Sequence, residues 1–362
     1  MKKLIALLLC VLLVASMFAG CGKKESTKLR VAVQSFYCSS MVEYIQVNEL
    51  DKKAGLDIEW LVFNGGAPIN EAMGEWDIAV TGGAFVYALA NYDCKLVAHQ
   101  VDGTAGNNFV CRTGDPLASA TTKEEMAAAV KGKTILTCIG TTGHYTVNMF
   151  LASIGLNPED VTMMNLEIPN VYASWVAGEG DYAVLTEPYC YYDMDAINTV
   201  VVGTLESSGG QLLESTVCTS AAYKSRKDDI VKFVKILYDA CDALAADEDL
   251  AVRTVVDWYK RCGKTITEDE ARASVQGKPF MSIENAKKLV LGDFAKSYAA
   301  WFQSRELIDA AGLAKVGANI ASDVLAEAYK FCNKPGLINS VSGEGDKIDK
   351  IFPILAENKG WQ

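Results

Sequence analysis

Two glycine–threonine loops are the segments of this chain best suited to chemistry. Thr81-Gly82-Gly83 follows the apolar run 76–80, and Gly140-Thr141-Thr142-Gly143 follows the apolar run 133–139. Each loop leads into a stretch of helical character, so its hydroxyls and backbone N–H groups lie where an anion is stabilised. Glycine also lets a ligand approach the backbone, because it has no Cβ. One such loop is commonly only a helix cap, whereas the pair predicts a binding cleft.

Charge and histidine content argue against several other kinds of chemistry. Lys and Arg total 34 against 45 Asp and Glu, a net charge of -11, which disfavours broad capture of nucleic acid through its phosphates. The only two histidines, His99 and His144, leave little room for a multi-histidine metal site. We find no Ser-His-Asp arrangement and no phosphate-binding loop with a lysine. We therefore expect capture of a solute rather than catalysis, with no metal and no other cofactor.

The elements that position these loops alternate between strands and helices. A first unit has predicted strands at 29–33, 58–63, 76–80 and 95–99, with helices at 40–50, 68–73 and 84–90. A second unit has strands at 133–139, 161–166 and 182–185, with helices at 122–130 and 171–177. Between the turn 140–144 and Gly155 it has a further helix, whose buried face is formed by Val147, Phe150, Leu151 and Ile154. Long helices are predicted at 227–246, 248–261, 283–303 and 321–331. The alternation indicates an α/β fold with parallel, doubly wound sheets.

The length of 362 residues suits two domains. We expect two α/β lobes joined by crossing segments that act as a hinge. The predicted boundaries are a signal peptide at 1–20, a tether at 21–28, the first part of lobe one at 29–111, lobe two at 112–203, the completion of lobe one with the C-terminal helices at 204–335, and a peripheral tail at 336–362. One cleft per chain makes a monomer sufficient.

The N-terminus has the features of an export signal. Lys2 and Lys3 precede the apolar run 4–19, which as a helix spans about 24 Å, short of the ~30 Å hydrocarbon core. A signal peptide therefore fits better than a permanent membrane helix. The sequence Phe18-Ala19-Gly20-Cys21 resembles a bacterial lipobox, in which Cys21 is lipidated and anchors the protein to the membrane. The alternative is an ordinary secretory signal followed by an incidental cysteine.

Beyond Cys10 and Cys21 the chain has nine cysteines, with no pair at the spacing of a zinc knuckle or redox motif. An odd number cannot all pair within one chain. Because most of them lie among apolar neighbours, we interpret them as small buried hydrophobic residues.

Seven short segments share a family pattern, at 77–82, 88–91, 132–135, 140–145, 155–161, 178–184 and 187–189. Together they resemble the substrate-binding proteins of nitrate/sulfonate/taurine-type ABC importers. The resemblance spans about residues 28–240 and implies a periplasmic-binding-protein fold of type II. It also implies an extracytoplasmic protein that captures a solute between two closing lobes and delivers it to a membrane permease driven by an ATPase. Thr186 and Ala84 depart from the family pattern, which often has tryptophan and proline there.

The resemblance also implies ten ligand contacts, which lie in the loops of both lobes. They are Ser35, Phe36, Thr81, Gly82, Gly83, Thr141, Thr142, His144, Tyr145 and Glu187. His144 could donate a hydrogen bond to an anion, with a charge adjustable near neutral pH, or pack in the first turn of its helix. Glu187 could hold an amine or amide, or form an ion pair within its lobe. Phe36 and Tyr145 could form walls of the site or belong to the core.

These loops contain no Lys or Arg, so we expect a neutral site that binds its anion through dipoles. Such a site suits a small anionic or zwitterionic solute such as a sulfonate, taurine or nitrate. Its aromatic residues equally suit a pyrimidine or another heteroaromatic nutrient. Two further alternatives remain open: a small-molecule biosynthetic enzyme on the same fold, against which the export signal argues, and a sensory module that reports occupancy to a membrane partner.

Overall fold

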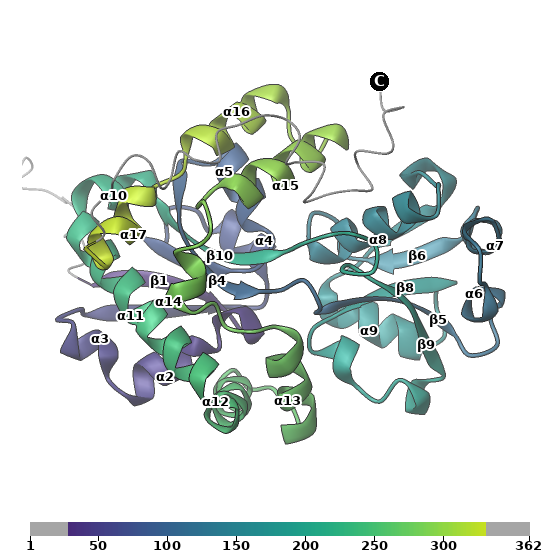
Figure 1. The fold of residues 1–362 in the computed structure, drawn as a ribbon, viewed down its shortest axis with the longest axis horizontal. Helices are drawn as coiled ribbons and strands as arrows, with labels where there is room; N and C mark the ends of the chain where they lie inside the picture. Colours follow the sequence, from purple (N-terminus) through teal and green to yellow (C-terminus); the bar gives the residue numbers. More distant parts are fainter. Residues whose placement is uncertain (1–27, 331–362) are drawn as a thin grey trace, which may run out of the picture.

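The computed structural model describes residues 28–330, and two five-stranded sheets lie side by side in it (Figure 1). The predicted signal peptide, nearly all of the tether, Cys21 and the tail lie outside the described residues. The first sheet has the order β2-β1-β3-β10-β4, formed by Ile58–Phe63, Leu29–Gln34, Ile78–Thr81, Leu213–Thr219 and Cys94–Asp102. The second has the order β7-β6-β8-β5-β9, formed by Thr162–Asn165, Thr134–Thr137, Tyr182–Thr186, Asn107–Arg112 and Thr199–Thr204. The two sheets therefore repeat one topology, and the α/β fold class is confirmed.

The sheets are mixed, so the expectation of purely parallel sheets is wrong. β10 runs antiparallel to β3 and β4, and β5 runs antiparallel to β8 and β9. Each of these two strands enters its sheet directly from the other lobe, and neither was predicted, nor was β9. Because an antiparallel strand begins at the edge where its parallel neighbours end, the first residues of β5 and β10 lie at the edge that carries the predicted loops.

Helices cover both faces of the sheets, as doubly wound packing requires. The helices that connect strands of the first sheet are α2 (Met41–Val47), α3 (Leu50–Lys53), α4 (Gly66–Glu71) and α5 (Phe85–Asn91). Those of the second are α6 (Pro116–Ser119), α7 (Lys123–Val130), α8 (Thr142–Ser153) and α9 (Ile168–Val176). The C-terminal set is α10 (Ser220–Ser225), α11 (Lys227–Ala246), α12 (Glu248–Arg261), α13 (Glu268–Gly277), α14 (Ile283–Ala286), α15 (Asp293–Ser304), α16 (Ala310–Ala318) and α17 (Ser322–Ala328). Within residues 28–330 no helix is long and apolar enough to cross a membrane.

The helix predictions met different outcomes. α11 and α12 have the predicted bounds, and the capping box of α7 is present, with the Glu125 N–H donating to Thr122 Oγ1 at 3.2 Å. The single helix expected at 283–303 is wrong, because the chain breaks between α14 and α15, where Gly292 has φ +125°. α13 and α16 were not predicted. Gly292 is accommodated because glycine tolerates positive φ without steric cost.

The C-terminal helices pack on the first lobe and enlarge its core (Figure 1). That core is one cluster that includes Trp76, Phe233 and Trp258, whereas the second sheet buries a separate cluster on each face. All eight described cysteines are free, and six of them are buried. The interpretation of these eight as unpaired small hydrophobic residues agrees with this burial.

Residues 103–106 and 205–212 connect the two lobes. The Gly103 N–H donates to Leu212 O at 2.9 Å, and the Leu212 N–H donates to Thr104 Oγ1 at 3.0 Å, so the two crossing segments are hydrogen-bonded to each other. Residues 107–111, predicted to belong to the first lobe, are part of the second sheet through β5. The chain thus crosses earlier than expected, because the antiparallel strand of the second lobe comes first in the sequence.

Candidate functional site

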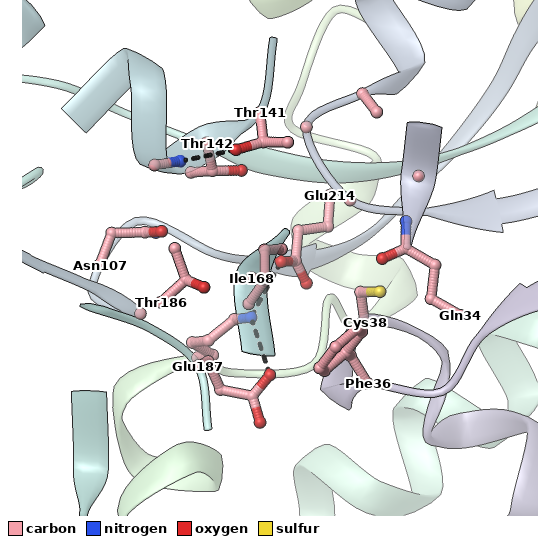
Figure 2. A pocket seen from close by; sticks show the side chains of 17 residues that line it. Gln34, Phe36, Cys38, Asn107, Thr141, Thr142, Ile168, Thr186, Glu187 and Glu214 are labelled. Carbon is pink, nitrogen blue, oxygen red and sulfur yellow. Dashed lines mark hydrogen bonds and ion pairs between the residues drawn. The ribbon is translucent and has the colours of Figure 1, made fainter. Parts of the chain in front are cut away.

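A cavity of about 70 Å³ lies between the lobes, where β1, β3, β6 and β8 end and β5 and β10 begin (Figure 2). We call it the inner cavity. Its lining residues are Gln34, Phe36, Cys38, Gly66, Gly82, Gly83, Ala84, Gly106, Asn107, Thr141, Thr142, Gly143, Ile168, Thr186, Glu187, Glu214 and Lys278. Figure 2 shows the hydroxyls of Thr141 and Thr142 and the carboxylates of Glu187 and Glu214 arranged around it.

Six of the ten predicted contact residues line this cavity: Phe36, Gly82, Gly83, Thr141, Thr142 and Glu187. The two glycine–threonine loops face each other across it. A Cβ on Gly83 would lie 2.7 Å from Thr142 Oγ1, so the loops of the two lobes are in close contact. Thr141 is the N-cap of α8, its hydroxyl accepting a hydrogen bond from the Gly143 N–H at 3.2 Å.

The other four predicted residues do not line the inner cavity. Ser35 Oγ donates to Asn64 Oδ1 at 3.2 Å, and the buried Thr81 hydroxyl accepts a hydrogen bond from Gln34 Nε2 at 2.5 Å. Thr81 therefore positions Gln34, which does line the cavity.

His144 and Tyr145 join the lobes away from the inner cavity. Both project from the first turn of α8 onto α15 of the first lobe. The ring centroids of Tyr145 and Tyr298 are 4.6 Å apart, and those of His144 and Trp301 are 6.0 Å apart. Burial, assisted by the charge of Arg305, lowers the pKa of His144 to about 4. The imidazole is therefore neutral at pH 7, not adjustable near neutral pH.

The polar residues that the antiparallel strands bring to the cleft were not predicted. Asn107 is the first residue of β5, and Glu214 is the second residue of β10. The available signal was one acidic residue in the otherwise uncharged run Leu212-Leu213-Glu214-Ser215-Thr216-Val217. Gln34, at the end of β1, was also missed, although it adjoins a predicted contact residue. Thr186, at the end of β8, was singled out only as a departure from the family pattern, and it lines the cavity.

The most important residue that was not predicted is Lys278, which directly follows α13 and lines the inner cavity. Its Nζ lies 2.9 Å from Glu214 Oε1 and 3.9 Å from Glu187 Oε2, and all three side chains are buried. The expectation of a site without charged groups other than Glu187 is therefore wrong. No local pattern could have revealed Lys278, because 64 residues separate it from Glu214.

Two carboxyl groups share this single ammonium. Burial raises the pKa of Glu187 and of Glu214, and the charge of Lys278 offsets part of each rise. Burial alone would lower the pKa of Lys278, but Glu214 and Glu187 raise it above its usual value. When all three groups are ionised, the cluster keeps one net negative charge, which favours a positive group on a ligand.

The crossing segment leaves room for this charged cluster only because it contains glycine. A Cβ on Gly106 would lie 2.5 Å from Lys278 Cδ, and a Cβ on Gly103 would lie 2.9 Å from Glu214 Cγ. The backbone that connects the lobes therefore packs directly on the buried side chains. The charged side chains of Lys278 and Glu214 are thus in direct contact with the segment that connects the lobes.

Two polar atoms at the cavity lack a hydrogen-bond partner among residues 28–330. They are Glu214 Oε2 and Thr186 Oγ1, and both are buried. An unsatisfied buried carboxylate oxygen is costly, so a donor on a bound molecule would be strongly favoured there. Within the same residues no three His, Cys, Asp or Glu side chains are grouped to hold a metal ion.

The sequence of this chain is similar to those of known binding proteins. No family model matches the chain. The chain is 31% identical over 345 residues to a putative ABC transporter periplasmic binding protein of Brachyspira hyodysenteriae, covering 91% of this chain and 99% of that protein. The chain belongs to the periplasmic binding proteins of ABC transporters. The resemblance identified in the sequence is thereby confirmed.

Two further comparisons agree with this family. The taurine-binding periplasmic protein of Escherichia coli K12 is 24% identical over 266 residues, covering 69% of this chain and 77% of that protein. The alkanesulfonate-binding protein SsuA of Xanthomonas axonopodis pv. citri, solved with bound MOPS, has a TM-score of 0.66 at 18% identity, covering 82% of this chain and 99% of that one. This periplasmic binding protein thus shares the fold of that alkanesulfonate-binding protein, and its inner cavity lies between the two lobes.

Proposed function

We propose that this periplasmic binding protein captures a small zwitterionic solute in the inner cavity and delivers it to the permease and ATPase of an ABC importer. It acts outside the cytoplasm as a binding protein and not as an enzyme. Closure of the lobes traps the solute, because a ligand that contacts both lobes binds the closed form more tightly than the open one.

The buried carboxylate of Glu214 is the observation that carries the choice of solute. Its Oε2 has no partner among residues 28–330, and together with Glu187 it outweighs the charge of Lys278. A primary or secondary ammonium would donate to Glu214 and neutralise the surplus negative charge. A simple anion would gain little from Lys278, because both carboxylates already compete for that ammonium.

The opposite side of the inner cavity suits an anionic group. Thr141, Thr142 and Gly143 form the N-terminus of α8, a helix of 12 residues, where backbone N–H groups and the helix dipole favour negative charge. Taurine combines an ammonium with a sulfonate, and the relatives named for taurine and alkanesulfonate support this chemistry. The site therefore fits a zwitterion better than a sulfonate without an amine.

Isothermal titration calorimetry with taurine and ethanesulfonate tests this proposal, because the two compounds differ only in the ammonium. We expect taurine to bind at least tenfold more tightly, and Glu214→Gln to remove most of that difference. Equal or tighter binding of ethanesulfonate would contradict the zwitterion assignment. Native mass spectrometry of freshly purified protein gives an independent check, since a co-purified solute would be released on denaturation.

Membrane attachment and a monomeric state complete the proposal. The lipobox-like sequence at Cys21 supports a lipid anchor on the outer face of the cell membrane. One chain contributes both walls of the inner cavity, so a monomer suffices for binding.

A further inference from the structure

A second, larger cavity lies next to the inner one. It has a volume of about 630 Å³, and we call it the outer cavity. Phe36 lines both cavities. Tyr259 lines the outer cavity, and its hydroxyl donates a hydrogen bond to Glu187 of the inner cavity. The two spaces therefore adjoin each other at the end of the cleft where the carboxylates lie.

The sizes of the two cavities suggest a division of roles. Pockets for small molecules usually measure about 300–1,000 Å³. The inner cavity, at about 70 Å³, is below this range, whereas the outer cavity, at about 630 Å³, is within it. The inner cavity can hold a small charged head group, and a larger solute would have to extend into the outer cavity.

The outer cavity has aromatic walls on both lobes. On the second lobe, the ring centroids of Tyr189 and Tyr192 are 5.4 Å apart, and Tyr172 stacks on Tyr189 at 4.7 Å with an interplanar angle of 17°. We call these three residues the tyrosine panel. Tyr189 and Tyr192 line the cavity, and Tyr172 supports them.

The wall on the first lobe is held in place by a lysine. The Nζ of Lys264 lies 3.4 Å from the centroid of the Phe36 ring and donates to Ser35 O at 3.0 Å. A cation over a ring face is attractive, so Phe36 has a defined position. Polar groups of Glu167, Asn64 and Asn170 also line the cavity and could satisfy heteroatoms on a ring.

We propose that the solute carries a planar aromatic group, which occupies the outer cavity between the tyrosine panel and Phe36 while its charged head group fills the inner cavity. Aromatic pairs in stacked or edge-to-face arrangements gain energy beyond the area that they bury. Because Tyr259 links the outer cavity to Glu187, the ring extends from the ammonium end of the head group. This inference rests on the proposed function and specifies its class of substrate.

Three probes separate the head group from the ring. Taurine is the head group alone, N-benzyltaurine adds an aromatic ring on the nitrogen, and N-(cyclohexylmethyl)taurine adds a saturated ring of similar size. Titration calorimetry on the purified full-length protein should give an affinity for N-benzyltaurine at least tenfold above that for taurine and about threefold above that for the saturated analogue.

The variant Tyr192→Leu tests whether the higher affinity for N-benzyltaurine comes from the outer cavity, which Tyr192 lines. This variant should lose most of the advantage of N-benzyltaurine while binding taurine within about twofold of the wild type. Tyr87→Leu is the matched control, because Tyr87 is an exposed residue of α5 that lines neither cavity, and it should leave all three affinities unchanged. Thermal unfolding of both variants verifies that they are folded.

The outcomes distinguish the two proposals. If taurine and N-benzyltaurine bind wild type equally, or if the aromatic and saturated analogues do, the aromatic assignment is overturned while the zwitterion site stands. If Tyr192→Leu leaves the advantage of N-benzyltaurine intact, the assignment to the outer cavity is also overturned. If none of the three compounds binds, both proposals fail together.

Discussion

Tyr259 and Glu187 are hydrogen-bonded to each other across the cleft. The tyrosine belongs to α12 of the first lobe, and the glutamate follows β8 of the second lobe. Both are buried, and the hydroxyl of Tyr259 donates to Glu187 Oε1. The bond therefore joins the two lobes directly at the inner cavity, and a separation of the lobes would break it.

We expect Tyr259→Phe to weaken taurine binding by about tenfold or more. A hydrogen bond to a charged group contributes about 1.5–3 kcal/mol, and here it stabilises the closed form. Tyr238→Phe is a matched control, because the Tyr238 hydroxyl donates to His99 O at 2.8 Å entirely within the first lobe. Both variants should lower the melting temperature, but only the first should lower affinity in titration calorimetry. Unchanged affinity in Tyr259→Phe would show that this bond does not support closure.

Gly83→Ala should hold the lobes apart. Its new Cβ would lie 2.7 Å from Thr142 Oγ1, which belongs to the other lobe, so the loops would have to separate. A Cβ at the neighbouring Gly82 would meet nothing nearer than 3.8 Å, which makes Gly82→Ala the control. Small-angle X-ray scattering should give a larger radius of gyration for Gly83→Ala only. Equal radii in the two variants would mean that Thr142 can move aside.

Taurine affinity should fall as the pH is lowered below neutral. Burial raises the pKa of Glu214, so this carboxylate takes up a proton at a higher pH than an exposed one and then no longer attracts an ammonium. Loss of one charge lowers the affinity by at most about tenfold per pH unit. Titrations of Glu214→Gln should show a shallower pH dependence, with only Glu187 still titrating. An equal slope in both proteins would exclude Glu214 as the responsible group.

The two histidines should make the fold sensitive to acid. Burial lowers the pKa of His99 to about 3 and, with the charge of Arg305, that of His144 to about 4, both below the ordinary value of 6.5. Below pH 6.5 the unfolded chain therefore binds protons that the folded chain does not, and the free energy of unfolding falls by up to about 1.4 kcal/mol per pH unit for each histidine. The raised pKa values of Glu187 and Glu214 act in the opposite direction.

His144→Phe isolates one of these contributions, because phenylalanine keeps a ring next to Trp301 without a titrating group. Between pH 7 and pH 5 the wild type should lose about 2 kcal/mol more than the variant. Urea unfolding at the two pH values measures this difference. The same loss in both proteins would show that His144 titrates normally.

Cys21→Ala should abolish lipid attachment. If Cys21 is the acylated N-terminus, radiolabelled fatty acid enters the wild-type protein and not the variant. Cys10→Ala, within the predicted signal peptide, is the control and should label normally. Equal labelling of Cys21→Ala and wild type would favour the ordinary secretory signal.

The predictable parts of the fold are those with a local physical signal. α11 and α12 were placed at their observed bounds because their apolar residues repeat with a helical period and their ends carry clear boundaries. The loops at Gly82 and Thr141 were placed at the cleft because parallel strands end at one edge of their sheet. By contrast, the break between α14 and α15 was not predicted, because the helical pattern of the sequence continues through Gly292.

The sequence by itself determined the α/β class, two facing loops and a solute-binding family. Tertiary structure alone decided the electrostatics of the site and the role of the first turn of α8. Glu214 and Asn107 reach the cleft because an antiparallel strand enters each sheet from the opposite lobe, and Lys278 reaches it from the end of α13, much later in the chain. The physical reason is that strand and helix periodicity are local, whereas a buried charge acquires its partners only when distant segments pack together.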